Sequence, residues 1–424
     1  MKTRVNLGTL IVVVLLMAGC SSGGYDRYRG QLLGEMDRPN WSPTIPYGMI
    51  YVPTGQLHIG QSDQDVNASL WQKAKSVSIQ GFYMDDTEIT NNEYRQFTHW
   101  VRDSIAHTIL EHFQEPDFND NEWIDWTVQI EWESPEVREA LDEMYVPYNQ
   151  RIGGRDELNT GVLQYDYWDI DWRKASMAKV TKVSRLEVID NDMSINVYPD
   201  TLVWIRDFTY SYNEPMARNY FSHPAFDDYP VVGITWEQAN AFSHWRTKFY
   251  GEYMRERNLA LMDKFRLPTE HEWEYAARGG RDLAQYPWGG PYVRNSKGCI
   301  LANFKPGRGN YPEDGGFYTV RADAYWPNDW GLYNMAGNVA EWTSTAFYEG
   351  AYTFIHDLNP DIQYDADPSE PQTLHRKVIR GGSWKDVGYY IQTSSRHWEF
   401  EDSCKSYVGF RCVSTFLGRD HNDR

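Results

Sequence analysis

Two short segments of this chain carry oxygen-bearing side chains at a spacing that could hold a hard cation. One joins residues 303–304 to an acidic, glycine-containing turn at 313–316, and the other is the eight-residue segment 334–341. Carboxylates, carboxamides and carbonyl groups at glycine turns are the ligands that Ca²⁺ prefers. Considered alone, each segment is more typical of an Asx-turn than of a metal site, so spacing by itself does not favour calcium.

Other residues with chemical potential give weaker signals. Ser383 follows two glycines but lacks the flanking pattern of a nucleophile elbow, which favours a simple turn. His107 and His112 are five residues apart, which is the wrong spacing for one face of a helix, so we expect packed or solvated side chains rather than metal ligands. We expect His244 and His397 to be structural as well.

Three cysteines follow the N-terminal segment, namely Cys299, Cys404 and Cys412. Three scattered cysteines do not form a zinc pattern, and an odd number leaves at least one free thiol. An oxidising compartment would permit a disulfide. We expect Cys404 to pair with Cys412, because the two are close in sequence and lie near the end of one unit.

Three helices are predicted from their start signals. In each, a Thr is followed three residues later by Glu or Gln, which is the capping-box pattern, and an amphipathic run comes next. The pairs are Thr90 with Glu93, Thr235 with Gln238 and Thr269 with Glu272. Residues 49–53 and 56–60 predict a short hairpin around Thr54 and Gly55, and residues 76–84 alternate as a further strand.

Residues 106–222 form a long acidic, aromatic stretch with weak periodicity. A structureless loop of that length is unusual in a compact domain, so we expect an insertion with its own strands or an element that binds a partner. Trp is the residue type that most often dominates interface energies, and the candidate partner contacts are Trp123, Trp126, Trp168 and Trp172. Packing of these side chains in the insertion's own core is an equally good interpretation.

The composition predicts a folded, acidic protein. Of 424 residues, 41% are hydrophobic and 15% are aromatic, far too many for a disordered chain. Lys and Arg number 41 against 60 Asp and Glu, and the resulting net charge of -19 repels phosphates, which excludes nucleic acid as a partner. Residues 279–412 are rich in Gly, Asn and Asp, so we expect loops to dominate that half.

The first residues resemble a bacterial lipoprotein signal. Lys2 and Arg4 precede an apolar run at 7–17 that is too short for a stable membrane span, and small residues then lead to Cys20 and a Ser/Gly tether. We therefore expect acylation of Cys20 and anchoring at the periplasmic face of the outer membrane, with an ordinary secretory signal as the alternative. Residues 1–19 would be the signal peptide, 20–47 a tether and extended lead-in, and 416–424 a C-terminal tail.

Several motifs together resemble the formylglycine-generating-enzyme family, also called sulfatase-modifying factors. They are RLPTE at 266–270, EWEYAARGG at 272–280, YPWG at 286–289, GLYNM at 331–335, GNV at 337–339, EW at 341–342, RGGSW at 380–384 and GFRC at 409–412. The resemblance covers about residues 48–102 and 223–415. It implies an α+β, irregular, loop-rich, C-type-lectin-like fold, with one domain formed by 48–105 and 223–415 around the 106–222 insertion.

The same resemblance assigns site residues. It implies two structural Ca²⁺ sites, one with Asn303 and Asp314 and the other with Asn334, Gly337, Val339 and Glu341.

Enzymes of this family oxidise a sulfatase cysteine with O₂ at a copper ion held by two thiolates. In this sequence the corresponding positions are Asp386 and Ile391, and neither side chain is a ligand for soft Cu(I). We therefore expect a pseudoenzyme without copper and without catalytic residues. The cysteine that commonly pairs with the last one in this family is Ser243 here.

Residues 47–49, 82–104 and 380–386 also resemble a narrower family, the gliding-motility lipoproteins of the GldK (PorK) type. That resemblance implies a structural component of the type IX secretion machinery, which assembles into a ring with a periplasmic partner of the GldN (PorN) type. The related GldJ type shares the domain and stays an alternative. Two other classes remain open, a formylglycine-generating oxidase and a lectin-like binder of the cell wall.

Overall fold

The structure is a computed structural model that describes residues 44–60, 73–115, 123–154, 156–184, 186–210, 215–307, 312 and 316–418. Pro43–Arg424 forms one compact unit. Within the described ranges, no helix combines the length and the apolar character that a membrane crossing requires. The predicted signal peptide, the lipidation site Cys20 and the predicted calcium ligand Asp314 lie outside the described residues.

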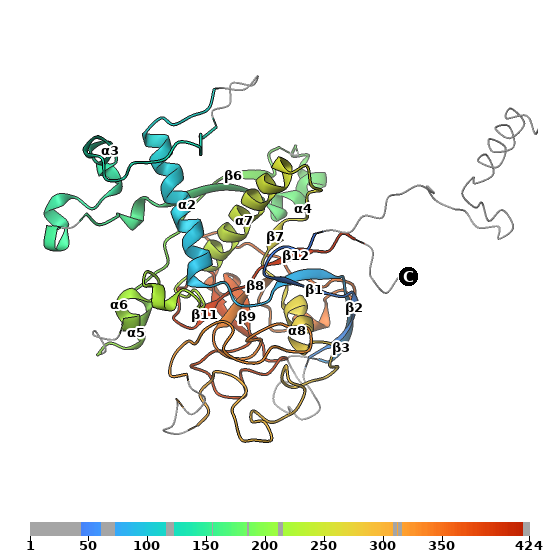
Figure 1. The fold of residues 1–424 in the computed structure, drawn as a ribbon. Coiled ribbons are helices and arrows are strands. Elements are labelled where there is room, and N and C mark those ends of the chain that lie inside the picture. Colours follow the sequence, from blue (N-terminus) through green and yellow to red (C-terminus); the bar gives the residue numbers. More distant parts are fainter. Residues whose placement is uncertain are drawn as a thin grey trace, which may run out of the picture. The chain divides into compact units, whose positions relative to one another are not determined.

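Short helices and strands alternate with long loops (Figure 1). The α-helices are α2 (Asn91–Ile109), α3 (Pro135–Ala140), α4 (Trp172–Thr181), α5 (Val203–Asp207), α6 (Pro215–Asn219), α7 (Trp236–Glu256) and α8 (Glu270–Arg278). The strands are β1 (Met49–Val52), β2 (Gly55–Ile59), β3 (Lys75–Ile79), β4 (Phe82–Asp85), β5 (Gln164–Ile170), β6 (Ile189–Asn196), β7 (Phe265–Arg266), β8 (Ala340–Ala346), β9 (Arg376–Arg380), β10 (His397–Phe400), β11 (Val408–Gly409) and β12 (Val413–Thr415). The predicted α+β, loop-rich class is confirmed.

Two four-stranded sheets form the frame. The first has the order β1-β4-β12-β7 and is antiparallel throughout, while the second has the order β10-β9-β8-β11 and ends in a parallel pair, β8 with β11. Helices α2 and α7 lie side by side (Figure 1) and bury aromatic side chains against these strands. Tyr94 of α2 stacks on Phe242 of α7 at a centroid distance of 5.5 Å, and Phe410 meets both rings edge-on.

The three predicted helix starts are confirmed. In α2, α7 and α8 the Thr side chain accepts the N–H of the third residue of the helix, and that residue's side chain accepts the N–H of the Thr. The N–H of Thr90, for example, donates to Oε2 of Glu93 at 2.8 Å. These reciprocal bonds satisfy donors that a helix otherwise leaves open at its first turn.

The predicted hairpin at 49–60 is wrong. Strands β1 and β2 do not pair with each other: β1 pairs with β4 and β2 pairs with β3, both antiparallel. The segment predicted as one strand at 76–84 is broken at Gly81, whose N–H donates to Oγ1 of Thr54 at 2.9 Å. Residues 49–59 and 75–85 thus form one long antiparallel ribbon that is interrupted in its middle, near Thr54 and Gly81. No tight turn forms at Thr54.

The long insertion contains strands of its own, which confirms the first of the two interpretations offered for it. Strands β5 and β6 pair antiparallel, and the side chains of β5 alternate, with Tyr165 and Tyr167 buried and Trp168 exposed. The Tyr165 ring lies edge-on to Phe97 of α2 at 5.2 Å, so the insertion shares the main core. Helix α2 also continues to Ile109, past the predicted start of the insertion.

Candidate functional site

The loop that follows β9 carries the two positions that the motifs assign to copper. It begins with Gly381 and Gly382, whose φ angles are 88° and 64°. A Cβ on Gly382 would lie 2.7 Å from the carbonyl oxygen of Tyr390, so only glycine fits this turn. The close approach holds the two ends of the loop together.

Asp386 and Ile391 are both used by the fold itself. The Asp386 carboxylate accepts the N–H of Ser383 at 2.9 Å and its hydroxyl at 2.6 Å, which closes the turn. Ile391 is fully buried in an apolar cluster with Tyr286, Ile300, Ala302, Phe304 and Ala336. Asp386 therefore stabilises a turn and Ile391 is part of the hydrophobic core, so neither position offers a sulfur ligand.

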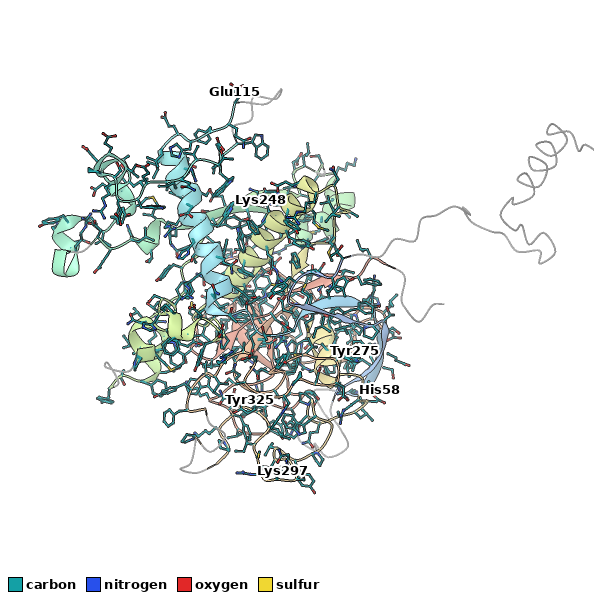
Figure 2. The ribbon with its side chains drawn as sticks, viewed as in Figure 1. His58, Glu115, Lys248, Tyr275, Lys297 and Tyr325 are labelled. Atoms are coloured by element: carbon teal, nitrogen blue, oxygen red, sulfur yellow. The ribbon has the colours of Figure 1, made fainter. Side chains whose placement is uncertain are left out.

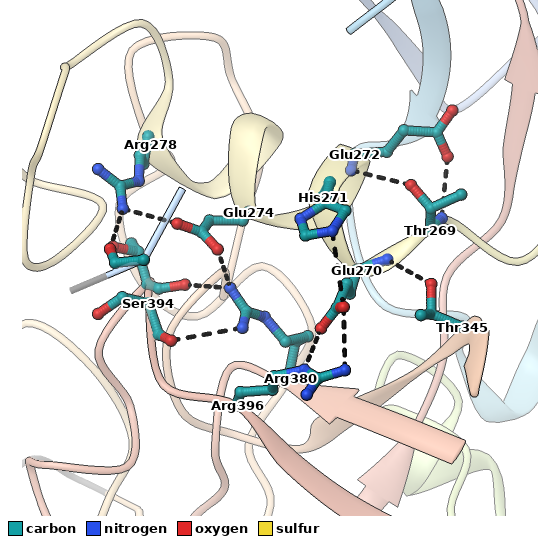
Figure 3. Close-up of polar contacts among 12 residues, drawn as sticks. Thr269, Glu270, His271, Glu272, Glu274, Arg278, Thr345, Arg380, Ser394 and Arg396 are labelled. Atoms are coloured by element: carbon teal, nitrogen blue, oxygen red, sulfur yellow. Dashed lines mark hydrogen bonds and ion pairs between the residues drawn. The ribbon is translucent and has the colours of Figure 1, made fainter. Parts of the chain in front are cut away.

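A buried ionic network fixes the base of this loop to α8 (Figure 3). The Arg380 guanidinium donates to Oε2 of Glu274 at 2.6 Å, and to the carbonyl oxygens of Thr393 at 2.7 Å and Ser394 at 3.4 Å. The other oxygen of Glu274 accepts from Arg278 at 2.6 Å. Because breaking a buried pair leaves an uncompensated charge, this network holds the loop in one arrangement.

Helix α5 of the insertion lies against the same loop. Trp204 of α5 stacks on Trp384 at 5.9 Å and 18°, and Nζ of Lys385 lies 2.9 Å from Oδ1 of Asp207. A cavity of about 220 Å³ remains beside these contacts. It is lined by Asp207, Phe208, Phe304, Lys305, Gly316, Phe317, Tyr318, Trp384 and Lys385.

The segment predicted as the second calcium site is tied into the interior by its only carboxylate. Oε2 of Glu341 accepts from Nε1 of Trp273 and Nε of Arg411, both at 2.7 Å. Oε1 accepts from Nη2 of Arg411 at 2.7 Å. The charge of Glu341 is therefore neutralised by a guanidinium, and one lone-pair position on Oε1 remains.

The same segment makes an unexpected contact with Glu88. The side-chain amides of Asn334 and Asn338 donate to its two oxygens at 3.1 Å and 3.0 Å. Complete burial is the main cause that raises the pKa of Glu88 to about 8. Asn334, Gly337 and Asn338 all have positive φ, and a Cβ on Gly337 would lie 2.3 Å from the carbonyl oxygen of Asn303.

The oxygens at 334–341 fit a Ca²⁺ ion in kind. Gly337 and Val339 are buried, and their peptide carbonyls accept no hydrogen bond from the part of the chain that the structure describes. Buried carbonyls are normally paired, and Ca²⁺ is one group that satisfies them. With Arg411 on Glu341, a cation here would be held mainly by neutral oxygens and water.

The other predicted calcium site can be followed only in part. Asn303 is buried, and its amide nitrogen donates to the carbonyl oxygen of Tyr318 at 2.7 Å and to Oδ1 of Asn338 at 3.2 Å. Its partner Asp314 lies outside the described residues, so this pairing stays a prediction. Among the residues that the structure describes, no three His, Cys, Asp or Glu side chains come together to hold a metal ion.

The predicted disulfide between Cys404 and Cys412 is not present, because the structure separates the two thiols into different clusters. Cys412 is fully buried beneath α7, where Sγ lies 3.4 Å from Oγ of Ser243. Cys404 packs with another apolar group, which includes Trp204. Burial raises the pKa of the Cys412 thiol to about 12 and that of Cys404 to about 11, and all three cysteines are free.

The four tryptophans predicted as partner contacts are exposed. The exposed fractions are 52% for Trp123, 44% for Trp126, 52% for Trp168 and 45% for Trp172. They do not form an internal core of the insertion.

Two of these tryptophans belong to a larger group across α2 and α7. Trp126 stacks on Trp100 at 5.3 Å, and Trp245 stacks on Phe249 at 5.3 Å and lies 6.4 Å from Trp100. Trp168 meets His244 edge-on at 5.9 Å, and Lys248 lies over the Trp100 ring at 5.5 Å. Lys248, which is labelled in Figure 2, comes from α7. We call this group the aromatic surface: Trp100, Trp126, Trp168, His244, Lys248 and Phe249, together with Trp245, which is only 5% exposed and lies beneath the others.

Sequence reasoning missed the members of the aromatic surface that lie outside the insertion. Trp245 and Phe249 are four residues apart on α7, a spacing that places two rings on one helix face. The four-residue spacing of these two rings is visible in the sequence. The stacking of Trp100 on Trp126 is not, because it joins α2 to a loop that comes 26 residues later.

Comparison with known proteins gives consistent matches. Residues 39–416 match the family described as the Sulfatase-modifying factor enzyme 1-like domain. The formylglycine-generating enzyme of Bos taurus is 26% identical over 407 residues, which is 94% of this chain and 82% of that enzyme. The inactive C-alpha-formylglycine-generating enzyme 2 of Bos taurus is 31% identical over 214 residues, 47% of this chain and 58% of that protein. Among solved structures, PvdO from Pseudomonas aeruginosa aligns with a TM-score of 0.48 and 14% identity over 87% of this chain and 94% of that one.

Proposed function

Because the chain belongs to the sulfatase-modifying factor, or formylglycine-generating enzyme, family, with a match that spans residues 39–416, we propose that it is a non-catalytic member that works as a scaffold. Its role is that of an outer-membrane lipoprotein of the GldK (PorK) type in the type IX secretion and gliding-motility machinery, with the GldJ type as the alternative. The family has inactive members, since two relatives are named as inactive enzymes.

One observation carries the non-catalytic part of the proposal. At the two positions where thiolates would hold copper, the chain places a carboxylate that closes its own turn, Asp386, and a core side chain, Ile391. Soft Cu(I) is bound by thiolate and thioether ligands, which neither residue supplies. The Asp386 carboxylate instead accepts a hydrogen bond from the hydroxyl group of Ser383.

The insertion supports the same conclusion from outside the loop. Helix α5 is held against Trp384 by ring stacking and against Lys385 by Asp207, whose carboxylate also accepts the hydroxyl of Ser406. Helix α5 thus covers part of the loop around Trp384 and Lys385.

The aromatic surface supports the scaffold part. Trp side chains supply large rigid contact areas, and monomeric proteins rarely expose contiguous aromatic groups without a partner. We propose that this surface contacts a periplasmic protein of the GldN (PorN) type. The net charge of -19 favours a partner with a basic face, because complementary charge speeds association.

Anchoring and repetition would make the assembly a ring. Acylation at Cys20 would restrict every copy to the plane of the outer membrane. Repeated head-to-tail contacts in a plane close into a ring when the rotation between neighbours permits it. Calcium, when bound at 334–341, would stiffen the loops by satisfying the carbonyls of Gly337 and Val339.

The non-catalytic part is tested by loading the purified full chain with Cu(I) and offering it a cysteine-bearing sulfatase peptide with O₂. We expect neither stoichiometric copper nor conversion of the cysteine. The double variant Asp386→Cys, Ile391→Cys serves as the matched control, and we expect it to gain Cu(I) binding. Stoichiometric copper and turnover in the unaltered chain would contradict the proposal.

A second function is favoured by the cavity beside Trp384. Its lining of Phe208, Phe304, Tyr318 and Trp384 with two lysines suits a ring-shaped ligand that also carries polar groups, such as a cell-wall sugar. Titration with soluble muropeptides, followed by chemical shifts of the tryptophan indole N–H groups, tests it. A Trp384→Ala variant that binds as well as the unaltered chain would exclude this cavity as the site.

A further inference from the structure

Helix α2 ends in a turn that brings two histidines together. The N–H of His112 donates to the carbonyl oxygen of His107 at 3.0 Å, and the N–H of Glu111 donates to that of Thr108 at 3.3 Å. Glu111 has a φ of 56°, a conformation in which glycine is the usual residue. This pair of bonds is the Schellman motif, in which the residue after the left-handed one packs on the last turn of the helix. In most proteins that contact is apolar, and here it joins two imidazoles.

The two rings face each other through the same atom. The Nδ1 atoms of His107 and His112 are 3.0 Å apart, and their ring centroids are 5.2 Å apart at an angle of 59°. Two charged imidazoles could not both be satisfied in this contact, because one Nδ1 must donate its proton and the other must accept it, as two neutral rings in different tautomers do. Zn–N bonds of 2.0–2.1 Å in a tetrahedral site separate two ligand nitrogens by roughly 3.3 Å. The pair therefore already stands close to the separation that a shared metal ion would impose.

The two histidines differ in burial, because packed side chains cover His107 and leave His112 partly exposed. His107 is 4% exposed and its ring lies 5.3 Å from that of Trp126, whereas His112 is half-buried. Burial and the neighbouring His112 lower the pKa of His107 below its usual value, and the nearby Asp103 and Asp125 oppose that shift. Both carboxylates have other partners, Arg102 for Asp103 and Thr127 for Asp125, so they would act from the outer shell.

We propose that His107 and His112 bind one divalent transition-metal ion through their Nδ1 atoms, with water in the remaining coordination positions. Imidazole nitrogen selects ions such as Zn²⁺, Cu²⁺ and Ni²⁺ rather than Ca²⁺ or Mg²⁺. Among the described residues, no third His, Cys, Asp or Glu joins the two histidines. Binding displaces the proton shared by the two Nδ1 atoms into solvent.

The site is independent of the calcium segment and of the family's copper positions. It lies at the start of the insertion, where α2 ends, and Trp126, whose ring lies beside that of His107, belongs to the aromatic surface. A metal ion here would hold the left-handed turn at Glu111 closed and fix the position of the ring that Trp126 packs against.

Isothermal titration of the full chain in detergent, purified without a polyhistidine tag, tests the proposal with Zn²⁺ alone. We expect saturable binding of one Zn²⁺, weakened at least about tenfold in His107→Gln and in His112→Gln and unchanged in the exposed control His356→Gln. Circular dichroism establishes that each variant is folded, and His112→Gln is the milder change because the residue is only half-buried. Cu²⁺ in place of Zn²⁺ should give an electron paramagnetic resonance spectrum with nitrogen couplings that both variants lose. Zn²⁺ binding that is absent, or that is equally strong in both histidine variants, would overturn the proposal.

Discussion

The carboxylate of Glu341 and the guanidinium of Arg411 form a two-pronged ion pair in the protein interior. The distances Nε–Oε2 and Nη2–Oε1 are both 2.7 Å, and neither side chain is more than 1% exposed. Arg411 also donates to the carbonyl oxygens of Tyr333 and Asp85. One guanidinium therefore joins the 334–341 segment to the end of β4, which makes this pair the central tie of the loop-rich half.

Removing one member of this pair should destabilise the fold strongly. Glu341→Gln leaves Arg411 buried without its counter-charge, and we expect the free energy of unfolding to fall by about 3–5 kcal/mol. The matched control is Asp329→Asn, which removes the partner of Arg281 in a pair whose side chains are 54% and 44% exposed. Urea unfolding followed by circular dichroism should show a loss of no more than about 1 kcal/mol there. Equal losses in both variants would refute the role assigned to Glu341.

Calcium should stabilise the protein through the 334–341 segment. A ligand that binds only the folded state raises the melting temperature, so chelation with EGTA should lower it and excess Ca²⁺ should restore it. Mg²⁺ should not substitute, because it demands a stricter octahedral shell. Asn334→Ala should reduce the calcium-dependent shift. An unaltered chain that melts at one temperature with EGTA and with Ca²⁺ would contradict calcium binding.

Stability should decrease in mild acid because of His271. Burial lowers the pKa of this histidine below its usual 6.5, with Glu270 as the main opposing influence. As the pH falls from about 7 to 5, the unfolded state therefore takes up a proton that the folded state refuses, and the free energy of unfolding falls. His271→Phe keeps a ring against Tyr352, 5.4 Å away, and removes the proton uptake. We expect the variant to lose less stability over this range; parallel pH profiles would exclude His271 as a source.

A disulfide should form when the missing family cysteine is restored. Ser243 lies against Cys412 with Oγ and Sγ 3.4 Å apart, so Ser243→Cys places two sulfurs in contact beneath α7. We expect mass mapping under non-reducing conditions to find residues 243 and 412 linked and the unfolding free energy to rise by about 2–4 kcal/mol. The double variant Ser243→Cys, Cys412→Ser is the control. A linked pair that leaves stability unchanged would show that closing this loop strains the native fold.

The parts of this fold that depend on local chemistry could be predicted from sequence. Each capping box, such as Thr90 with Glu93, uses a side chain and a backbone N–H only three residues apart, so its pattern is complete in the sequence. The alternation of Tyr165 and Tyr167 with Trp168 likewise reports a strand with one buried face. That Asp386 and Ile391 stand where the family resemblance places two thiolates could be read from residue identity alone.

The parts that depend on distant segments could not be predicted. Strand β1 pairs with β4 rather than with β2, and the bond between Gly81 and Thr54 that interrupts this ribbon joins residues 27 positions apart, so no local signal reports it. His107 and His112 seemed unrelated at a spacing of five, because the left-handed turn at Glu111 that joins them is rarely formed by Glu. The partners of Glu341 and Cys412 are likewise set by tertiary contacts with Arg411 and Ser243.

The proposed scaffold role is better tested by substitutions on the aromatic surface than by deletion of the insertion. Tyr165 packs in the main core and α5 packs on Trp384, so deleting residues 106–222 would remove core contacts as well as surface. Trp126→Ser with Trp168→Ser changes only exposed rings of the aromatic surface. Trp326→Ser, at a site that is 69% exposed and outside that surface, is the control.

Affinity isolation of the full chain from native outer membranes, followed by mass spectrometry and electron microscopy, tests this claim most directly. We predict that the unaltered chain and the Trp326→Ser control isolate with a periplasmic partner of the GldN type in ring-shaped particles, and that the double Trp126, Trp168 variant loses both the partner and the rings. A lone monomer from the unaltered chain, or rings that persist in the double variant, would contradict the account.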